Sequence, residues 1–256
     1  MDAATPMPTL SPEQLSELLT LLRGADSVEL KLTVPDTDRR STVAALGLDP
    51  LDAQLRQVVF FDTPDLQLDR MGLVVRARRT QNKPGDSVVK LRPVDPAALP
   101  DGLRNDRRFS VEVDALPGGF VCSGTMKDEV DGGDVKEVIA GRREVSTLFG
   151  KKQRALFAAH SDGVRLDDLS VLGPITVAKL KWTPTDFNRR MVAELWFYPD
   201  GGRILELSTK CPPADTFTAA AESKAYLGSH GVDLGAEQQT KTRSALEFFA
   251  GELAAS

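Results

Sequence analysis

Charged residues alternate with apolar ones along several short segments, and this alternation constrains the fold more than any other feature of the sequence. In the run Ser27-Val28-Glu29-Leu30-Lys31-Leu32, every second residue is polar. Successive side chains of a β-strand point to opposite faces, so the polar residues would share one face. The design recurs in Arg76-Ala77-Arg78, Lys90-Leu91-Arg92, Glu112-Val113-Asp114, Lys179-Leu180-Lys181 and Glu206-Leu207-Ser208-Thr209-Lys210. We therefore expect a sheet with one strongly charged face.

The order of the segments predicts an α+β fold with about eight strands in mostly antiparallel succession. Ser11, followed by a proline and an acidic residue, indicates the start of a first helix. Separate strands are expected over 163–171 and 175–183, and a hairpin joins the strands 191–198 and 203–210. The acidic, glycine-rich stretch 123–134 is expected to be a surface loop.

Two arrangements of the charged sheet fit the pattern. Alternation alone favours an open antiparallel sheet, in which the apolar face packs on helices and the charged face meets water. In the other arrangement the sheet closes into a barrel, whose interior can hold one small ligand. The charged face consists mainly of Arg, Lys and Glu, often as pairs of one sign that gain nothing on a plain surface. This composition favours the barrel, with opposite charges, a ligand and a metal compensating one another inside.

Length, charge and cysteine content limit the classes of function. The 256 residues fit a single domain over 11–256, preceded by a disordered Pro- and Ala-rich tail over 1–10. A net charge of −5 argues against general nucleic-acid binding, so any attraction for phosphate is local. The two cysteines lack metal-site spacing and are expected to be reduced thiols of a cytoplasmic protein. No apolar run reaches the roughly 18 residues that span a membrane.

Several segments resemble one known family, the CYTH domain or triphosphate tunnel metalloenzyme superfamily. The most specific resemblance lies in Phe60-Phe61-Asp62-Thr63-Pro64-Asp65-Leu66-Gln67-Leu68 and in Gly72-Leu73-Val74-Val75-Arg76-Ala77-Arg78-Arg79. Weaker ones are Val88-Val89-Lys90-Leu91-Arg92, the late strand 206–210 and Gln239-Thr240-Lys241-Thr242-Arg243. The family's E-x-E-x-K signature corresponds here to Ser27-Val28-Glu29-Leu30-Lys31. The resemblance covers nearly the whole chain, from about Ser27 to Phe249.

The resemblance implies an eight-stranded antiparallel β-barrel, or tunnel, with flanking helices. Members of the family bind triphosphate compounds with Mg²⁺ or Mn²⁺. They hydrolyse inorganic tripolyphosphate, thiamine triphosphate or nucleoside triphosphates, or they cyclise ATP to cyclic AMP. The expected partner is thus a small triphosphate or polyphosphate, with no nucleic acid and no membrane.

The resemblance also implies roles for particular residues. Lys31 would be catalytic, contacting the terminal phosphate or orienting the attacking water. Seven cations would bind phosphate: Arg76, Arg78, Lys90, Arg92, Lys179, Lys181 and Lys210. Four carboxylates would hold the metal: Glu29, Glu112, Glu194 and Glu206.

Two positions depart from the family pattern. Ser27 replaces the first glutamate of the signature, and Ser208 stands where a second carboxylate is often found. The loss of two anionic ligands should weaken metal binding. Three functions therefore stay open: a metal-dependent triphosphatase, a class IV-type adenylate cyclase, and a polyphosphate- or nucleotide-binding module with little turnover.

Overall fold

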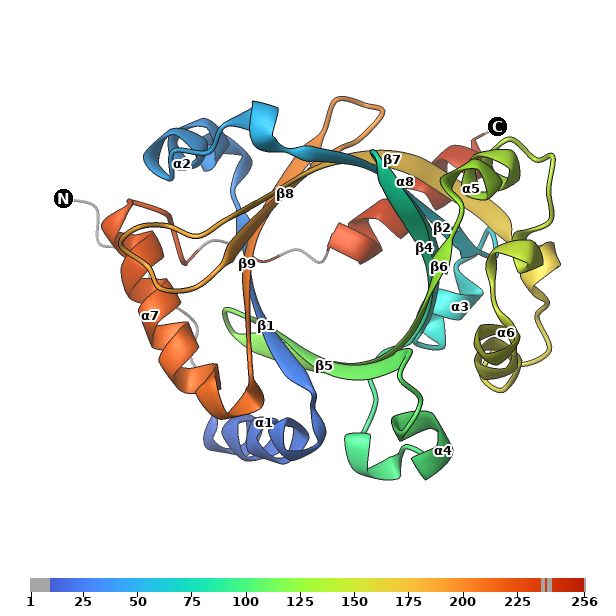
Figure 1. Cartoon of the computed structure of the whole chain (residues 1–256), viewed down its shortest axis with the longest axis horizontal. Coiled ribbons are helices and arrows are strands. Elements are labelled where there is room, and N and C mark those ends of the chain that lie inside the picture. The colour runs from blue at the N-terminus through green and yellow to red at the C-terminus, as the bar shows by residue number, and fades with distance from the viewer. Residues whose placement is uncertain (1–9, 236–237, 239–240, 256) are drawn as a thin grey trace.

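The computed structural model describes residues 10–235, 238 and 241–255. Within them, nine strands form one closed barrel in the order β1-β5-β6-β4-β3-β2-β7-β8-β9, and Figure 1 looks into the ring. The strands are β1 (Ser27–Val34), β2 (Gln54–Asp62), β3 (Leu73–Thr80), β4 (Lys83–Leu91), β5 (Phe109–Leu116), β6 (Gly119–Val130), β7 (Ser170–Trp182), β8 (Met191–Phe197) and β9 (Arg203–Cys211).

Most helices lie around the outside of this ring, whereas the last helix begins within its outline (Figure 1). They are α1 (Pro12–Gly24), α2 (Arg39–Ala45), α3 (Gln67–Arg70), α4 (Asp101–Arg104), α5 (Gly132–Ile139), α6 (Lys151–Ala158), α7 (Thr216–Ser229) and α8 (Lys241–Ala254). The expected start of the first helix is confirmed, because Ser11 Oγ accepts a hydrogen bond from the backbone N–H of Gln14 at 3.2 Å.

The predicted α+β barrel with flanking helices is confirmed, but its strand count and pairing differ from the prediction. The described barrel has nine strands instead of eight, and β1 pairs with β5 in parallel. The extra strand is β6, in the stretch expected to be a loop. It pairs with β4 on one side and β5 on the other. A complete hydrogen-bond ladder on both edges outweighs the low strand preference of Gly and Asp.

A second difference concerns β7, which is one strand where two were expected. The break was expected between residues 171 and 175, where Gly173 and Pro174 lie. They form a local irregularity instead, and the register with β2 shifts between Val58 and Phe60. Gly173 has a φ of 128°, and a β-carbon there would lie 3.2 Å from the carbonyl oxygen of Val58. A glycine thus allows the two strands to stay paired across the irregularity.

The two faces of the barrel wall pack against different helices. Outward-facing apolar residues such as Val28 and Val111 are fully buried, in one cluster with Leu18 and Leu22 of α1. α8 is different, because its Ala245, Leu246 and Phe249 cluster with residues of the interior. We call this set the apolar plug; its barrel members are Val58, Phe60, Leu172, Ile175, Val177 and Trp196.

The segment that carried the strongest resemblance is a structural turn between β2 and β3. The buried carboxylate of Asp62 accepts hydrogen bonds from the backbone N–H groups of Thr63, Leu68 and Asp69, at 2.7, 2.8 and 3.0 Å. These bonds cap α3 and fix where β3 begins. The motif therefore sets the register of the arginines that follow it on β3.

Some predictions fall outside the described residues. Residues 1–9 of the expected tail and residues 239–240 of the resembling segment are among them. The division into a tail and one domain stays a prediction. None of the described helices combines the length and the apolar character needed to cross a membrane.

Candidate functional site

The interior of the barrel holds a cavity of about 220 Å³ lined mainly by charged side chains. Among the described residues, eight basic and four acidic side chains line it, an excess of four positive charges. The basic ones are Lys31, Arg56, Arg76, Arg78, Lys90, Arg92, Lys179 and Lys241, and the acidic ones Glu29, Glu112, Asp114 and Glu194. The charged face is thus enclosed, and the open-sheet alternative is wrong. A cavity of this charge attracts a compact polyanion.

Three carboxylates gather on the wall formed by β1 and β5: Glu29, Glu112 and Asp114, which we call the acid triad. The parallel pairing sets Glu29 opposite Asp114 and Ser27 opposite Glu112. One oxygen from each of the three carboxylates lies within 4.8 Å of the other two. Hard divalent cations prefer oxygen ligands, so this donor set fits Mg²⁺ or Mn²⁺.

Asp114 is the most heavily paired member of the acid triad. Its side chain is 1% exposed, and its Oδ1 lies 2.8 Å from Lys31 Nζ and its Oδ2 3.3 Å from Lys90 Nζ. Burial raises the pKa of Asp114, but the two ammonium groups outweigh burial and hold it below its ordinary value. Burial lowers the pKa of Lys31, while Asp114 and Glu29 raise it to a net value above the ordinary one. At neutral pH, Lys31 is therefore a cation and Asp114 an anion.

The arginines of β3 differ in how they are held. Arg78 is fixed by Asp86, which accepts from its Nε at 2.9 Å and from its Nη2 at 2.8 Å. The Nε of Arg76 is buried and has no hydrogen-bond partner among the described residues. Burial, and then the like charge of Arg78, lower the pKa of Arg76 to about 10. Arg76 thus stays charged at neutral pH with an unsatisfied donor inside the barrel.

Glu194 of β8 and Glu206 of β9 enclose the ammonium group of Lys241, the first residue of α8. Lys241 Nζ forms ion pairs with Oε2 of Glu194 and, at 2.6 Å, with Oε1 of Glu206. The other oxygen of Glu194 lies 2.7 Å from Lys179 Nζ. Burial raises the pKa of Glu194, but Lys241 and Lys179 bring it well below its ordinary value. We call these four residues the lysine clamp.

The structure brings most of the predicted site residues together. Nine line the cavity: Lys31, Arg76, Arg78, Lys90, Arg92, Lys179, Glu29, Glu112 and Glu194. Glu206 is 4% exposed and contacts Lys241. Lys181 is exposed near the end of β7, and Lys210, 60% exposed, pairs with Glu112. Both lie near the ends of their strands, outside the cavity lining, because the alternation continues past the enclosed part of the barrel.

Three charged cavity residues, Asp114, Arg56 and Lys241, were missed at the sequence level. Asp114 was visible in the alternating pattern, but its role as partner of Lys31 depends on the parallel β1–β5 pairing. Arg56 lies outside the alternating segments noted in the sequence, and its Nε is also buried without a hydrogen-bond partner among the described residues. Lys241 stood in a segment that resembles the family, yet only the position of α8 places it in the barrel.

Ser27 and Ser208, which stand where the resembling family has carboxylates, contact the acid triad. Ser27 Oγ donates to Oε2 of Glu112 at 3.2 Å. Ser208 Oγ donates to Oε1 of Glu29 at 2.9 Å. Each hydroxyl thus holds a carboxylate in place without adding negative charge.

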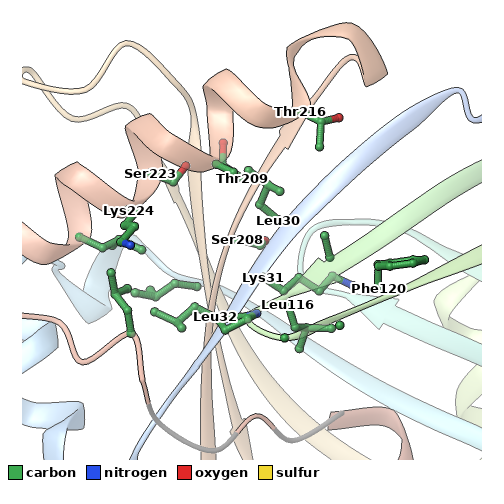
Figure 2. A pocket seen from close by; sticks show the side chains of 18 of the residues that line it. Leu30, Lys31, Leu32, Leu116, Phe120, Ser208, Thr209, Thr216, Ser223 and Lys224 are labelled. Carbon is green, nitrogen blue, oxygen red and sulfur yellow. The ribbon is translucent and has the colours of Figure 1, made fainter. Parts of the chain in front are cut away.

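A second pocket, of about 250 Å³, lies between β1, β9, the β5–β6 turn and α7 (Figure 2). Its lining is largely apolar and includes Leu30, Leu32 and Leu116, with Ser223 and Lys224 of α7. On β1 the leucines alternate with the cavity residues Glu29 and Lys31, so the leucine side chains lie on the opposite face of the strand. Lys31 and Ser208 line this pocket as well. It lacks the convergent charges of the interior, which is the stronger candidate site.

No protein-family model and no curated protein matches this sequence. Solved structures match its fold. The crystal structure of an adenylate cyclase candidate from Bacillus halodurans has a TM-score of 0.60 and 12% identity, covering 86% of this chain and 97% of that one. The adenylyl cyclase candidate HpAC1 from Hippeastrum, described as having a dominant triphosphatase activity, has a TM-score of 0.62 and 16% identity, covering 86% and 95%. Likeness at these identities establishes the fold alone.

Proposed function

We propose that this chain, whose fold is that of the CYTH or triphosphate tunnel superfamily, is a Mg²⁺- or Mn²⁺-dependent triphosphatase. The observation that carries the proposal is Arg76, a buried guanidinium whose Nε has no partner among the described residues, in a cavity with excess positive charge. A buried donor without a hydrogen bond costs about 1–3 kcal/mol. Phosphate oxygens, which form strong charge-assisted bonds with arginine, would satisfy it.

The basic wall of the cavity would bind the phosphate chain. Arg76 and Arg78 of β3, Lys90 of β4 and Arg92, which directly follows β4, line this wall. Asp86 occupies the Nε and Nη2 atoms of Arg78, so the other edge of this guanidinium is left for a ligand. Because Asp86 already fixes its orientation, Arg78 would lose little freedom on binding phosphate.

The acid triad would hold the metal beside the phosphates. Its oxygen donors fit Mg²⁺ or Mn²⁺, and the hydroxyls of Ser27 and Ser208 would keep two of its carboxylates oriented. The metal would supply charge neutralisation at the transferred phosphoryl group.

Lys31 would act as a fixed positive charge at the reacting phosphate. Its raised pKa means that it keeps its proton at neutral pH, so it does not serve as a base. Water would attack the terminal phosphorus, and the bond from this phosphorus to its bridging oxygen would break. The transition state of phosphoryl transfer is loose and needs positioning and charge more than a strong base. The lowered pKa of Asp114 makes this carboxylate a weak base, which agrees with a reaction that does not need a strong one.

Phosphate release tests the proposal. The substrates are tripolyphosphate, thiamine triphosphate and ATP, each with Mg²⁺, with Mn²⁺ or with a chelator. We expect metal-dependent release by the native chain and a large loss in Arg76→Met. Arg79→Met is the matched control: Arg79 lies on the same strand and its Nε is likewise buried without a partner among the described residues, but its side chain lies outside the cavity, where it donates to Gln57 at 2.6 Å. Release no greater than that of a Lys31→Ala, Arg78→Ala double variant would refute the proposal.

The same assay separates the two alternatives. Two structural neighbours bear the name of adenylate cyclases, so cyclic AMP is measured in the ATP reactions. Cyclic AMP in place of released phosphate would identify a cyclase. Tight binding of tripolyphosphate with neither product would identify a binding module.

A further inference from the structure

The four carboxylates expected to bind metal fall into two groups with different surroundings. Glu29 and Glu112 belong to the acid triad, whereas Glu194 and Glu206 belong to the lysine clamp. Glu194 and Glu206 are direct partners across β8 and β9, and they are only 9% and 4% exposed. Two like charges directly opposite each other on a sheet are destabilising. A buried pair of this kind needs a cation between its members.

Lys241 supplies that cation. Its Nζ contacts an oxygen of Glu194 and an oxygen of Glu206, and it lies 5.4 Å from the centre of the Trp196 ring. Lys179 takes the remaining oxygen of Glu194. Lys241 Nζ thus already contacts both carboxylates, at the position that a divalent ion shared by Glu194 and Glu206 would have to take.

The position of Lys241 is fixed by the packing of its helix. Lys241 is the first residue of α8, and the next turns place Ala245, Leu246 and Phe249 in the apolar plug. This packing holds the backbone of Lys241 beside the two glutamates, and the Lys241 side chain is only 16% exposed. The ammonium group is therefore part of the folded interior, in the manner of a bound ion.

We propose that Lys241 is a built-in cation that occupies the place of a divalent ion between Glu194 and Glu206. The chain then binds one divalent ion, at the acid triad. Lys241 supplies the positive charge that a second ion would otherwise bring. This inference rests on the proposed function in one respect: both place a divalent ion at the acid triad.

Counting Mn²⁺ ions tests this inference without measuring activity. Mn²⁺ binding is followed by electron paramagnetic resonance and equilibrium dialysis on the native chain and on Lys241→Met, which keeps side-chain length and removes the charge. We expect one ion for the native chain and two for Lys241→Met. Adding Glu194→Gln to Lys241→Met should return the count to one. Lys179→Met is the matched control, since it also removes a partner of Glu194 but leaves Lys241 in place; one ion is expected.

Thermal unfolding gives a second readout for a variant that is poorly folded without metal. An ion that binds only the folded state raises its melting temperature. Mn²⁺ should therefore raise the melting temperature of Lys241→Met more than that of the native chain or of Lys241→Arg.

The outcomes separate this inference from the proposed function. Equal ion counts for the native chain and Lys241→Met, or two ions in the native chain, would overturn the role of Lys241. No ion in the native chain and one in Lys241→Met would support the role of Lys241 and remove the metal from the acid triad, and with it the metal-dependent function.

Discussion

The interior of this barrel has two regions of opposite character on the same strands. β2 shows the change within five residues, because Arg56 lines the charged cavity, Val58 belongs to both regions, and Phe60 is buried in the apolar plug. The plug resembles an ordinary hydrophobic core, in which burial stabilises the fold. The cavity contains buried ions whose desolvation is offset only where they are paired. The comparison indicates that the plug serves stability, whereas the unpaired part of the cavity serves binding.

The largest effect on stability is expected where cavity ions are paired. Asp114→Asn leaves Lys31 and Lys90 without their shared anion, so the free energy of unfolding should fall by about 3–5 kcal/mol. Urea unfolding at neutral pH without ligand measures it. Asp65→Asn is the control: Asp65 pairs with Arg70 at the surface, with side chains 67% and 58% exposed, and its loss should cost much less than that of Asp114. Equal losses in the two variants would contradict the assignment of Asp114.

An unpaired cavity ion should show the opposite behaviour. Arg76→Met removes a charged donor that no described residue satisfies, so stability should stay within about 1 kcal/mol or rise. Turnover of tripolyphosphate should fall by about 10²–10³-fold, as for removal of one preorganised donor. Unfolding curves and initial rates on the same preparation measure both. A stability loss with unchanged turnover would place Arg76 among structural residues.

The plug should affect stability and leave binding nearly unchanged. Phe249 is 6% exposed, and Phe249→Ala should lower the free energy of unfolding by about 3 kcal/mol. Tripolyphosphate affinity, measured by calorimetry below the unfolding transition, should change by less than about tenfold, or 1.4 kcal/mol. A larger loss of affinity would show that the two regions are coupled through α8.

The dependence of stability on pH should arise from the cavity, because the plug does not titrate. The folded-state pKa values of Asp114 and Glu194 are lowered, so their stabilisation is present at neutral pH and is lost as pH falls below about 4. Those of Lys31 and Lys241 are raised, so theirs is lost as pH rises above about 10.4. A tenfold difference in proton affinity between the folded and the unfolded chain corresponds to about 1.4 kcal/mol. Unfolding at a series of pH values should give a plateau with two falling limbs, and Asp114→Asn should flatten the acid limb.

The smallest effect is expected at the edge of the acid triad. Ser27→Glu would place a fourth carboxylate near Glu112, since Ser27 Oγ lies 3.2 Å from Glu112 Oε2. Mn²⁺ affinity should rise by about tenfold, or 1.4 kcal/mol. Ser27→Gln has the same shape without the charge and should show no rise. A similar gain in both variants would mean that charge at this position is not what limits metal binding.

The sequence predicted which residues share a face of a strand. It did not predict which strands pair, nor the contacts between residues of neighbouring strands. Alternation placed Lys31, Arg76 and Lys90 on one face, and all three line the cavity. The partner strand of β1 could not be predicted in this way, because alternation shows which face a residue lies on and not which residue of another strand lies beside it. The contact between Lys31 and Asp114 was therefore missed, although both residues belonged to alternating segments.

Composition misled the prediction where pairing overrode local preference. The acidic, glycine-rich stretch 123–134 has the residues of a loop, yet most of it lies in β6 between two partner strands. The lysine clamp depends on a helix far along the chain reaching the interior. No local pattern around Lys241 distinguishes this position from an exposed helix start.

The place of β1 between β5 and β9 has a consequence for the order of folding. Its partners come later in the chain: residue 29 pairs with residue 114 on one edge and with residue 210 on the other. During synthesis the first strand must wait for nearly the whole chain before its second edge is covered. Contacts of such sequence separation slow folding and leave strand edges exposed meanwhile. The wall that carries Glu29 and Lys31 is thus also the seam at which the barrel closes.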